Sequence, residues 1–162
     1  MEKVSLRHVK SFLPSPRART LAAMLAFVFG IFLICHWVLW PVQVFGDSMD
    51  PNYENGTLHY VNKFAYLSEK PKRGDVVTVR VRPGEIFIKR IVGLPGEKLE
   101  FIDGRIVVNG KLLPEYYTDK MIPWKMDPVV LGPGDYYVIG DNRTISVLGA
   151  VPVERILGKV VL

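Results

Sequence analysis

Apolar positions are distributed in two different ways along the chain. Residues 21–45 form a continuous apolar run without one formally charged side chain, whereas later segments alternate in short stretches that end at glycine, proline, asparagine or aspartate. About 20 apolar residues make roughly 30 Å of helix, which matches the hydrocarbon core of a bilayer. The pattern therefore predicts one membrane-spanning helix from Leu21 to Trp40, ended by Pro41, and then a separate domain.

The apolar run has two other interpretations. The apolar core of a cleaved signal peptide is about 7–15 residues long and precedes a small-residue cleavage site, but this run is longer and contains Trp-Val-Leu-Trp-Pro at residues 37–41. A buried helix of a soluble protein is disfavoured by the length of the run and its lack of charge. We therefore expect an uncleaved membrane anchor over residues 21–44, between a short N-terminal segment, 1–20, and a larger domain, 45–162.

Basic residues are concentrated before the anchor. The formal net charge is +5, and the first twenty residues hold one acid, Glu2, against five basic side chains: Lys3, Arg7, Lys10, Arg17 and Arg19. Basic residues before a spanning helix stay in the cytoplasm, which predicts a single-pass protein of the cell membrane with its C-terminal domain outside. Basic and acidic residues are mixed after residue 60, so the expected partner is the lipid bilayer and not a nucleic acid.

The remainder of the chain has the pattern of a mainly β protein. Asp103-Gly104 and Asn109-Gly110 are typical of tight hairpin turns, and no long amphipathic helical pattern is present. We expect a compact antiparallel β domain with protected edges. Residues 114–130 predict a long irregular excursion, either a surface loop or a membrane-facing lip. The predicted strands are Val76–Arg82, Ile86–Val92, Lys98–Ile102, Arg105–Val108, Tyr136–Ile139 and Ile156–Val161.

Cysteine and histidine offer little chemistry. Cys35 is the only cysteine and lies in the predicted anchor, so neither an intrachain disulfide nor a cysteine-based metal site is expected. His8, His36 and His59 are scattered along the sequence, and the membrane would separate the first from the last. We therefore expect no metal, no cofactor and no histidine-based catalytic triad.

One lysine has an unusual position. In EIFIKRIVGLPG, residues 85–96, Lys89 should share one face of a strand with Phe87 and Ile91. Its ammonium could reach water while its stem covers apolar surface. Alternatively, burial between apolar walls could lower the lysine pKa from about 10.4 towards neutrality and create a base. The second interpretation requires a partner elsewhere in the chain.

Four motifs provide that partner. They are GDSMDP at residues 46–51, RGDVV at 73–77, FIKRIVGLPGE at 87–97 and GDNR at 140–143. In this order after an anchor they resemble the type I signal peptidases, the bacterial leader peptidases that use a serine–lysine dyad. The resemblance spans the chain from Pro41 to the C-terminus, and it implies a β domain of the signal-peptidase type in a compact, single-anchor form.

The resemblance implies roles for individual residues. Ser48 would be the nucleophile and Lys89 its neutral general base, while Ser146 would orient the lysine. Chemistry supports the pairing, because a serine hydroxyl is a weak nucleophile until a neighbouring base takes its proton. The Ser48 N–H would donate to the oxyanion, and the second donor is sought at Gly46, where some relatives carry a serine.

The same resemblance implies structural residues, a substrate and its pockets. Arg90 cannot act as the base, because guanidinium stays protonated in proteins, and it would instead pair with Asp141 to dock the GDNR loop on the lysine strand. The family cuts exported preproteins after signal peptides with small residues at positions −1 and −3. The shallow apolar pockets for these residues would be formed by Val42, Val44, Met49, Phe87 and Ile88.

The sequence also departs from the family pattern. After GDNRTIS the family continues with an acidic residue, serine and arginine, whereas here VLGAVP follows directly. Asn52 stands where a threonine is usual, and there is little room for the large second β domain of longer relatives. Two alternatives remain: a dedicated maturation protease for one secreted or conjugation-related substrate, and an inert, membrane-anchored β module that binds exported chains. GDNR and the compact start favour a bacterial membrane.

Overall fold

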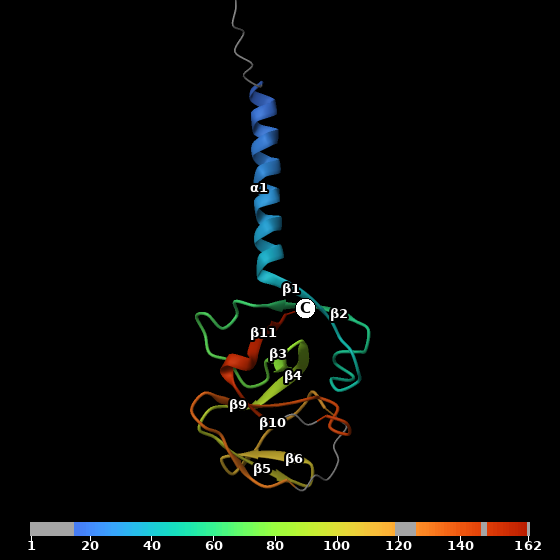
Figure 1. Ribbon diagram of the computed structural model, residues 1–162, viewed down its shortest axis with the longest axis vertical. Helices are drawn as coiled ribbons and strands as arrows, with labels where there is room; N and C mark the ends of the chain where they lie inside the picture. Colours follow the sequence, from blue (N-terminus) through green and yellow to red (C-terminus); the bar gives the residue numbers. More distant parts are fainter. Residues whose placement is uncertain (1–14, 119–125, 147–148, 162) are drawn as a thin grey trace, which may run out of the picture. The chain divides into compact units, whose positions relative to one another are not determined.

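The computed structural model, shown in Figure 1, describes residues 15–118, 126–146 and 149–161. These residues form two units, of which the first ends at Trp37 and the second begins at Val38. The first unit is helical, and the second consists almost entirely of β-strands and their connections. The predicted fold class, an N-terminal apolar helix followed by a mainly antiparallel β domain, is thereby confirmed.

Helix α1, Pro16–Val38, has 23 residues. Proline suits the first helical position, where its missing N–H would be unpaired in any case. The Ser15 hydroxyl caps the first turn by accepting a hydrogen bond from the Ala18 N–H at 3.3 Å. None of the helix residues is buried, and by length and composition the helix could cross a membrane.

The helix does not keep the predicted bounds. It begins at Pro16 and ends at Val38, three residues before Pro41, and Leu39–Gln43 forms strand β1 instead. The residue before a proline is disfavoured in the α conformation, whereas an edge strand can accommodate a proline that donates no hydrogen bond, and β1 is an edge strand. The predicted anchor segment, 21–44, therefore contains a helix and a strand.

A seven-stranded antiparallel sheet forms the larger part of the β unit. Its strand order is β1-β2-β11-β3-β4-β9-β10, so the last strand in the chain lies between two early ones. The bounds of the strands after β1 are Leu58–Asn62 for β2, Ile156–Val160 for β11, Val76–Arg82 for β3, Glu85–Gly93 for β4, Asp135–Ile139 for β9 and Gly149–Pro152 for β10. A short 3-10 helix, Val153–Arg155, joins β10 to β11.

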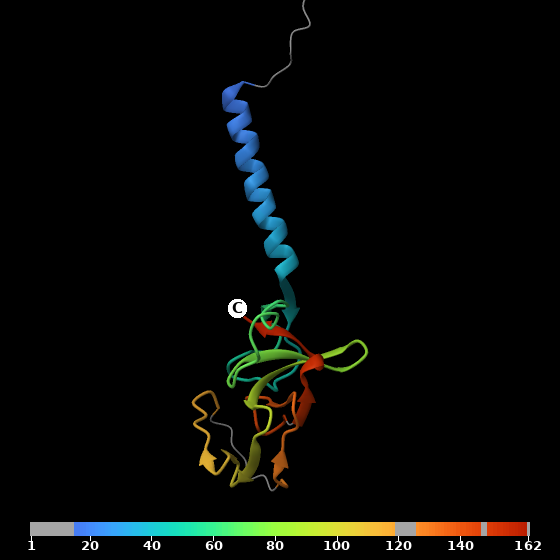
Figure 2. The ribbon, with the colours of Figure 1, turned by 90° about the vertical axis from the view of Figure 1, so that its left-hand side faces the viewer.

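A smaller four-stranded sheet has the order β7-β6-β5-β8. Asp103 and Gly104 have φ values of 49° and 78°, which fits the tight hairpin turn predicted between β5 and β6. Figures 1 and 2 both place β5 and β6 at the opposite end of the β unit from β1 and β2. The bounds are Lys111–Leu112 for β7, Arg105–Val108 for β6, Lys98–Ile102 for β5 and Val129–Val130 for β8.

All six predicted strands are present, and three of them, β3, β5 and β6, have the predicted bounds. The predicted excursion 114–130 is only partly described, because residues 119–125 lie outside the described residues. Its first part is neither a simple surface loop nor a simple lip: Glu115 is buried, while the neighbouring Tyr116 is 96% exposed. Its last part contributes strand β8.

The apolar side chains of the β unit gather in three buried clusters. One of them joins the loop after β1 to strands β2, β3, β4 and β11, and it therefore holds the GDSMDP motif against the larger sheet. We call it the serine-loop cluster, and its members are Val44, Met49, Val61, Val76, Ile88 and Val160.

Gly158 lets two strands approach closely beside this cluster. It lies at an irregularity in the pairing of β11 with β3. A Cβ atom at this position would stand 2.6 Å from the carbonyl oxygen of Asn62 and 2.7 Å from Cγ1 of Val61. The nearest obstacle is backbone, so it cannot rotate away.

We expect Gly158→Ala to lower the free energy of unfolding by about 1–3 kcal/mol, the usual range for overpacking. The measurement is urea unfolding of the detergent-solubilised chain, followed by tryptophan fluorescence. Gly132→Ala is the matched control, because its Cβ would meet the mobile carboxylate of Asp135 at 2.8 Å. Equal losses in the two variants would show that the close strand approach at Gly158 does not limit stability.

Candidate active site

Ser48 and Lys89 lie in contact, although 41 residues separate them in the sequence. The distance between Lys89 Nζ and Ser48 Oγ is 2.7 Å. Lys89 is in the middle of β4, and Ser48 is in the loop that follows β1. Met49, only 1% exposed, anchors this loop in the serine-loop cluster together with Ile88, the neighbour of Lys89 on β4.

The surroundings of Lys89 are mostly apolar. The residue is 5% exposed, and the fully buried Val77 lies opposite it in the pairing of β3 with β4. The ring centroid of Phe87 is 5.6 Å from Nζ. Burial lowers the pKa of Lys89 from 10.5 to about 8, and the carboxylate of Asp141 opposes this shift. No described carboxylate forms an ion pair with the ammonium.

Arg90, the next residue on β4, is fully engaged elsewhere. Its Nε and Nη2 donate to the two carboxylate oxygens of Asp141 at 2.7 and 2.6 Å, and its Nη1 donates to the carbonyl of Gly74 at 2.9 Å. Asn52 also donates to Asp141, at 2.9 Å. The Asp141 side chain is 0% exposed and that of Arg90 is 12% exposed. Both oxygens of the carboxylate are thus occupied away from Lys89.

The GDNR loop also holds the backbone of the serine loop. The Asn142 N–H donates to the carbonyl of Ser48 at 3.1 Å, and its side-chain amide donates to the carbonyl of Asp47 at 3.0 Å. Gly140 makes this approach possible, because a Cβ there would stand 2.1 Å from the Ser48 carbonyl oxygen. Sequence reasoning quoted Asn142 within a motif but assigned it no role, and it missed the contact of Asn52.

Ser146 reaches the same place without the expected hydrogen bond. A Cβ on Gly140 would stand 2.3 Å from Ser146 Oγ, so the hydroxyl is packed beside the serine loop. This hydroxyl is buried and has no hydrogen-bond partner among the described residues. The predicted role of Ser146 in orienting Lys89 therefore stays a prediction.

The two predicted oxyanion donors differ in their surroundings. The Ser48 N–H meets no acceptor in the described part of the chain, so it is available to a ligand. The Gly46 N–H, in contrast, donates to Oδ1 of Asn55 at 3.1 Å, and Gly46 has a φ of 88°. This left-handed conformation favours glycine.

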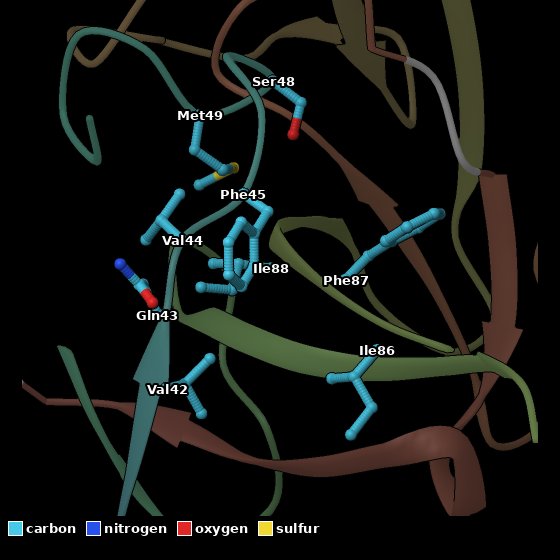
Figure 3. Close-up of a pocket in the computed structure, with 9 residues that line it drawn as sticks. All are labelled: Val42, Gln43, Val44, Phe45, Ser48, Met49, Ile86, Phe87 and Ile88. Carbon is cyan, nitrogen blue, oxygen red and sulfur yellow. The ribbon is translucent and has the colours of Figure 1, made fainter. Parts of the chain in front are cut away.

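A cavity of about 110 Å³, lined mostly by apolar residues, adjoins Ser48. Figure 3 shows one wall formed by residues just before the serine loop and the other by the first half of β4. Both walls carry open strand edges, since β1 ends the sheet and β9 pairs with β4 only from Arg90 onward. All five predicted pocket residues line this cavity, and its complete lining is Val42, Gln43, Val44, Phe45, Ser48, Met49, Ile86, Phe87 and Ile88.

A metal centre is not evident in the site. Within the described ranges, no three histidine, cysteine or carboxylate side chains gather closely enough to hold a metal ion. The polar groups near Ser48 are instead arranged as a neutralised ion pair, backbone hydrogen bonds and one buried amine. This arrangement suits proton transfer between a hydroxyl and an amine.

Comparison with known proteins places the chain among peptidases. The family described as "Signal peptidase, peptidase S26" matches residues 17–162. Signal peptidase I T of Bacillus subtilis (strain 168) is 31% identical, covering 97% of this chain and 87% of that protein. Signal peptidase IB of Staphylococcus aureus (strain Mu50 / ATCC 700699) is 28% identical over 80% of each chain. A crystal structure of a signal peptidase I from Enterococcus faecalis V583 is 27% identical, covering 57% of this chain and 98% of that one, with a TM-score of 0.48.

The family match includes the helix from its second residue onward, both sheets and all four motifs. The two bacterial relatives also cover most of their own length, so the similarity concerns whole proteins and not one shared segment. The chain therefore belongs to the signal peptidase family, peptidase S26.

Proposed function

We propose that this chain is a membrane-anchored serine endopeptidase that removes signal peptides from exported preproteins. Membership of the signal peptidase family supports the reaction and the substrate class. The observation that carries the catalytic assignment is the 2.7 Å contact of Lys89 Nζ with Ser48 Oγ, formed by a buried lysine. In this proposal Ser48 is the nucleophile and Lys89 the general base.

The proposed chemistry passes two protons through Lys89, first the Ser48 proton to the leaving amine and then a proton from water back to Ser48. Neutral Lys89 accepts the Ser48 proton while Oγ attacks the carbonyl carbon of the scissile peptide bond, which forms the tetrahedral intermediate. The protonated lysine then donates to the leaving amine, and an acyl-enzyme remains. Lys89 next takes a proton from the water that attacks the ester, and Ser48 regains its proton on release of the product.

The developing oxyanion requires a hydrogen-bond donor close to Ser48. The free Ser48 N–H supports its assignment as the first donor. The Gly46 N–H could join it only after leaving Asn55, so in our proposal Gly46 mainly shapes the loop through its left-handed φ of 88°. Ser146, packed against the serine loop, is proposed to orient Lys89 once the substrate excludes water.

Substrate binding follows from the two open strand edges. We propose that the signal peptide enters as an extended strand between β1 and the first half of β4. The cavity of about 110 Å³ is smaller than the roughly 300–1,000 Å³ of ordinary ligand pockets. Its apolar walls, including Val44 and Ile88, would accept small side chains at positions −1 and −3 and exclude large ones by steric clash.

The anchor and its orientation complete the proposal. Helix α1 is long and apolar enough to span the bilayer once, and the excess of basic residues lies before it and in its first turn. By the positive-inside rule, residues 1–20 stay in the cytoplasm and the domain from residue 45 faces outward. This arrangement would place the peptidase at the side of a bacterial cell membrane where exported preproteins emerge.

The dyad is tested with a model preprotein and the detergent-solubilised chain. Ser48→Ala and Lys89→Ala should each reduce kcat/KM by at least about 10³-fold, and the double variant should be no worse than either, because a nucleophile and its base act as a unit. Lys89→Arg should be equally inactive, since guanidinium does not deprotonate.

Lys72→Ala is the matched control for these variants. The Lys72 side chain is 68% exposed and, within the described part of the chain, pairs only with the exposed Glu69, so we expect activity at the parent level. Substantial cleavage by Lys89→Arg, measured by gel separation of preprotein and mature protein, would contradict the neutral-lysine mechanism.

The pH dependence should report the pKa of Lys89. Only the neutral amine accepts the Ser48 proton, so kcat/KM should rise with pH to a midpoint near the pKa of about 8. About one molecule in eleven is then competent at pH 7, compared with about one in 3,000 for an ordinary lysine of pKa 10.5. A rise with a midpoint near 10.5 would contradict the role of burial.

A substitution on β3 should move this midpoint. Val77→Thr places a hydroxyl opposite Lys89, where it can hydrogen-bond the ammonium and favour the charged form, so the midpoint should move to higher pH. Val151→Thr is the control, because Val151 is buried on β10, two strands away from β4. An equal shift in both variants would show that the effect does not come from the neighbourhood of Lys89.

The orientation is tested in intact spheroplasts that contain the full-length protein with an N-terminal tag. Added protease should digest the domain from residue 45 onward and leave the tag protected, because the five basic residues before the anchor keep that end inside. A protected domain with a digested tag would reverse the proposed topology.

A further inference from the structure

The segment Glu115–Thr118 is packed on the GDNR loop although it belongs to none of the motifs. The guanidinium of Arg143 binds both carboxylate oxygens of Glu115: Nη1 donates to Oε2 at 3.2 Å, and Nη2 donates to Oε1. The two side chains are 0% and 1% exposed. Tyr117 also donates its hydroxyl to Glu115, at 2.9 Å.

The rest of the segment contacts the groups that dock the loop. The ring centroid of Tyr117 is 4.2 Å from the guanidinium carbon of Arg90, and the Tyr117 carbonyl accepts a hydrogen bond from Asn52 at 2.6 Å. Thr118 donates its hydroxyl to the carbonyl of Asp141 at 2.6 Å. Each contact partner is a residue of the serine loop, the lysine strand or the GDNR loop.

A short chain of contacts leads from this segment to the nucleophile. Arg143 donates from Nε to the carbonyl of Gly140 at 3.0 Å, which fixes the turn of the GDNR loop. Asn142, between these two residues, holds the carbonyl of Ser48 at 3.1 Å. Gly140 itself leaves no space for a Cβ next to that carbonyl, so the backbone of the loop is packed directly against the backbone of Ser48.

Glu115 matters in this chain because it neutralises a buried cation. Removing one partner of a buried ion pair is strongly unfavourable, since the remaining charge has lost both water and its counter-charge. Without the carboxylate, Arg143 gains by turning towards solvent, and the Gly140 carbonyl and Asn142 would move with it. A displacement of about 1 Å in a catalytic group can reduce a rate by about 10²-fold.

We propose that Glu115 is a positioning residue for the serine–lysine dyad, acting through Arg143 and Asn142 on the backbone of Ser48. The inference rests on the proposed function, because it concerns the rate of the same reaction. It assigns Tyr117 a supporting role, since its hydroxyl holds the Glu115 carboxylate and its ring covers Arg90. The pocket for the peptide is lined by other residues, so substrate affinity should change little.

The test compares variants of the full-length, detergent-solubilised protein on the model preprotein. Glu115→Gln keeps the shape of the side chain and removes its charge, and we expect kcat to fall at least about tenfold with KM within about twofold of the parent. Glu100→Gln is the matched control: its carboxylate is 29% exposed and pairs with Lys98 in the smaller sheet, so both constants should stay at parent values.

A second variant separates positioning from a general loss of structure. Glu115→Gln/Arg143→Gln leaves no charge on either of these two side chains and can form an amide–amide hydrogen bond, so kcat should recover part of the loss. Rates are expressed per folded molecule, with the folded fraction taken from thermal unfolding under the assay conditions. If Glu115→Gln does not fold, the double variant is compared directly with Arg143→Gln, and a higher kcat in the double variant supports the proposal.

Several results would overturn the proposal. They are a folded Glu115→Gln enzyme with unchanged kcat, a loss that disappears when rates are corrected for the folded fraction, and a double variant that recovers nothing. A failure of the proposed function looks different, because Ser48→Ala would then still cleave the preprotein. A parent that requires Ser48 together with an unaffected Glu115→Gln enzyme would reject only the positioning role.

Discussion

A lysine that has to be uncharged is buried within hydrogen-bond distance of the hydroxyl it is proposed to deprotonate, and the other features of the site follow from this constraint. Desolvation lowers the pKa of Lys89 to about 8 only while water and carboxylates are kept from the amine. Asp141, the carboxylate that raises the Lys89 pKa, could defeat this by pairing with Lys89. Its two oxygens are instead held by Arg90 and Asn52.

Two adjacent residues of β4, Lys89 and Arg90, thus have opposite electrostatic requirements. Arg90 stays charged and is given a complete set of acceptors, whereas Lys89 is given one hydroxyl and an apolar neighbourhood. Alternation along β4 makes this separation possible, because successive side chains point to opposite faces of the sheet. The Arg90 side then receives the GDNR loop, whose Asn142 in turn holds the backbone of Ser48.

The sequence predicted the β domain more completely than it predicted the contacts within the site. Alternation between turn signals was enough for β3, β5 and β6, whose flanking residues are glycine, proline, asparagine or acidic residues. The end of the helix was misplaced, because Leu39 and Trp40 are as apolar in an edge strand as in an anchor. The proposed dyad was suggested by motifs in a fixed order, and no periodicity could have joined residues 48 and 89.

Local sequence patterns could not predict the proposed role of Glu115, for a different reason. An acidic residue in an irregular, aromatic-rich segment is typical of an exposed surface loop. Only folding brings it into contact with Arg143, 28 residues away. The counter-charge of Arg143 comes from Glu115, which lies in a segment outside the motifs. Two neutral pairs, Arg90 with Asp141 and Arg143 with Glu115, lie near the proposed dyad. Because the charges within each pair cancel, burial remains the largest influence on the Lys89 pKa. The apolar side chains around Lys89 are therefore sufficient to lower that pKa.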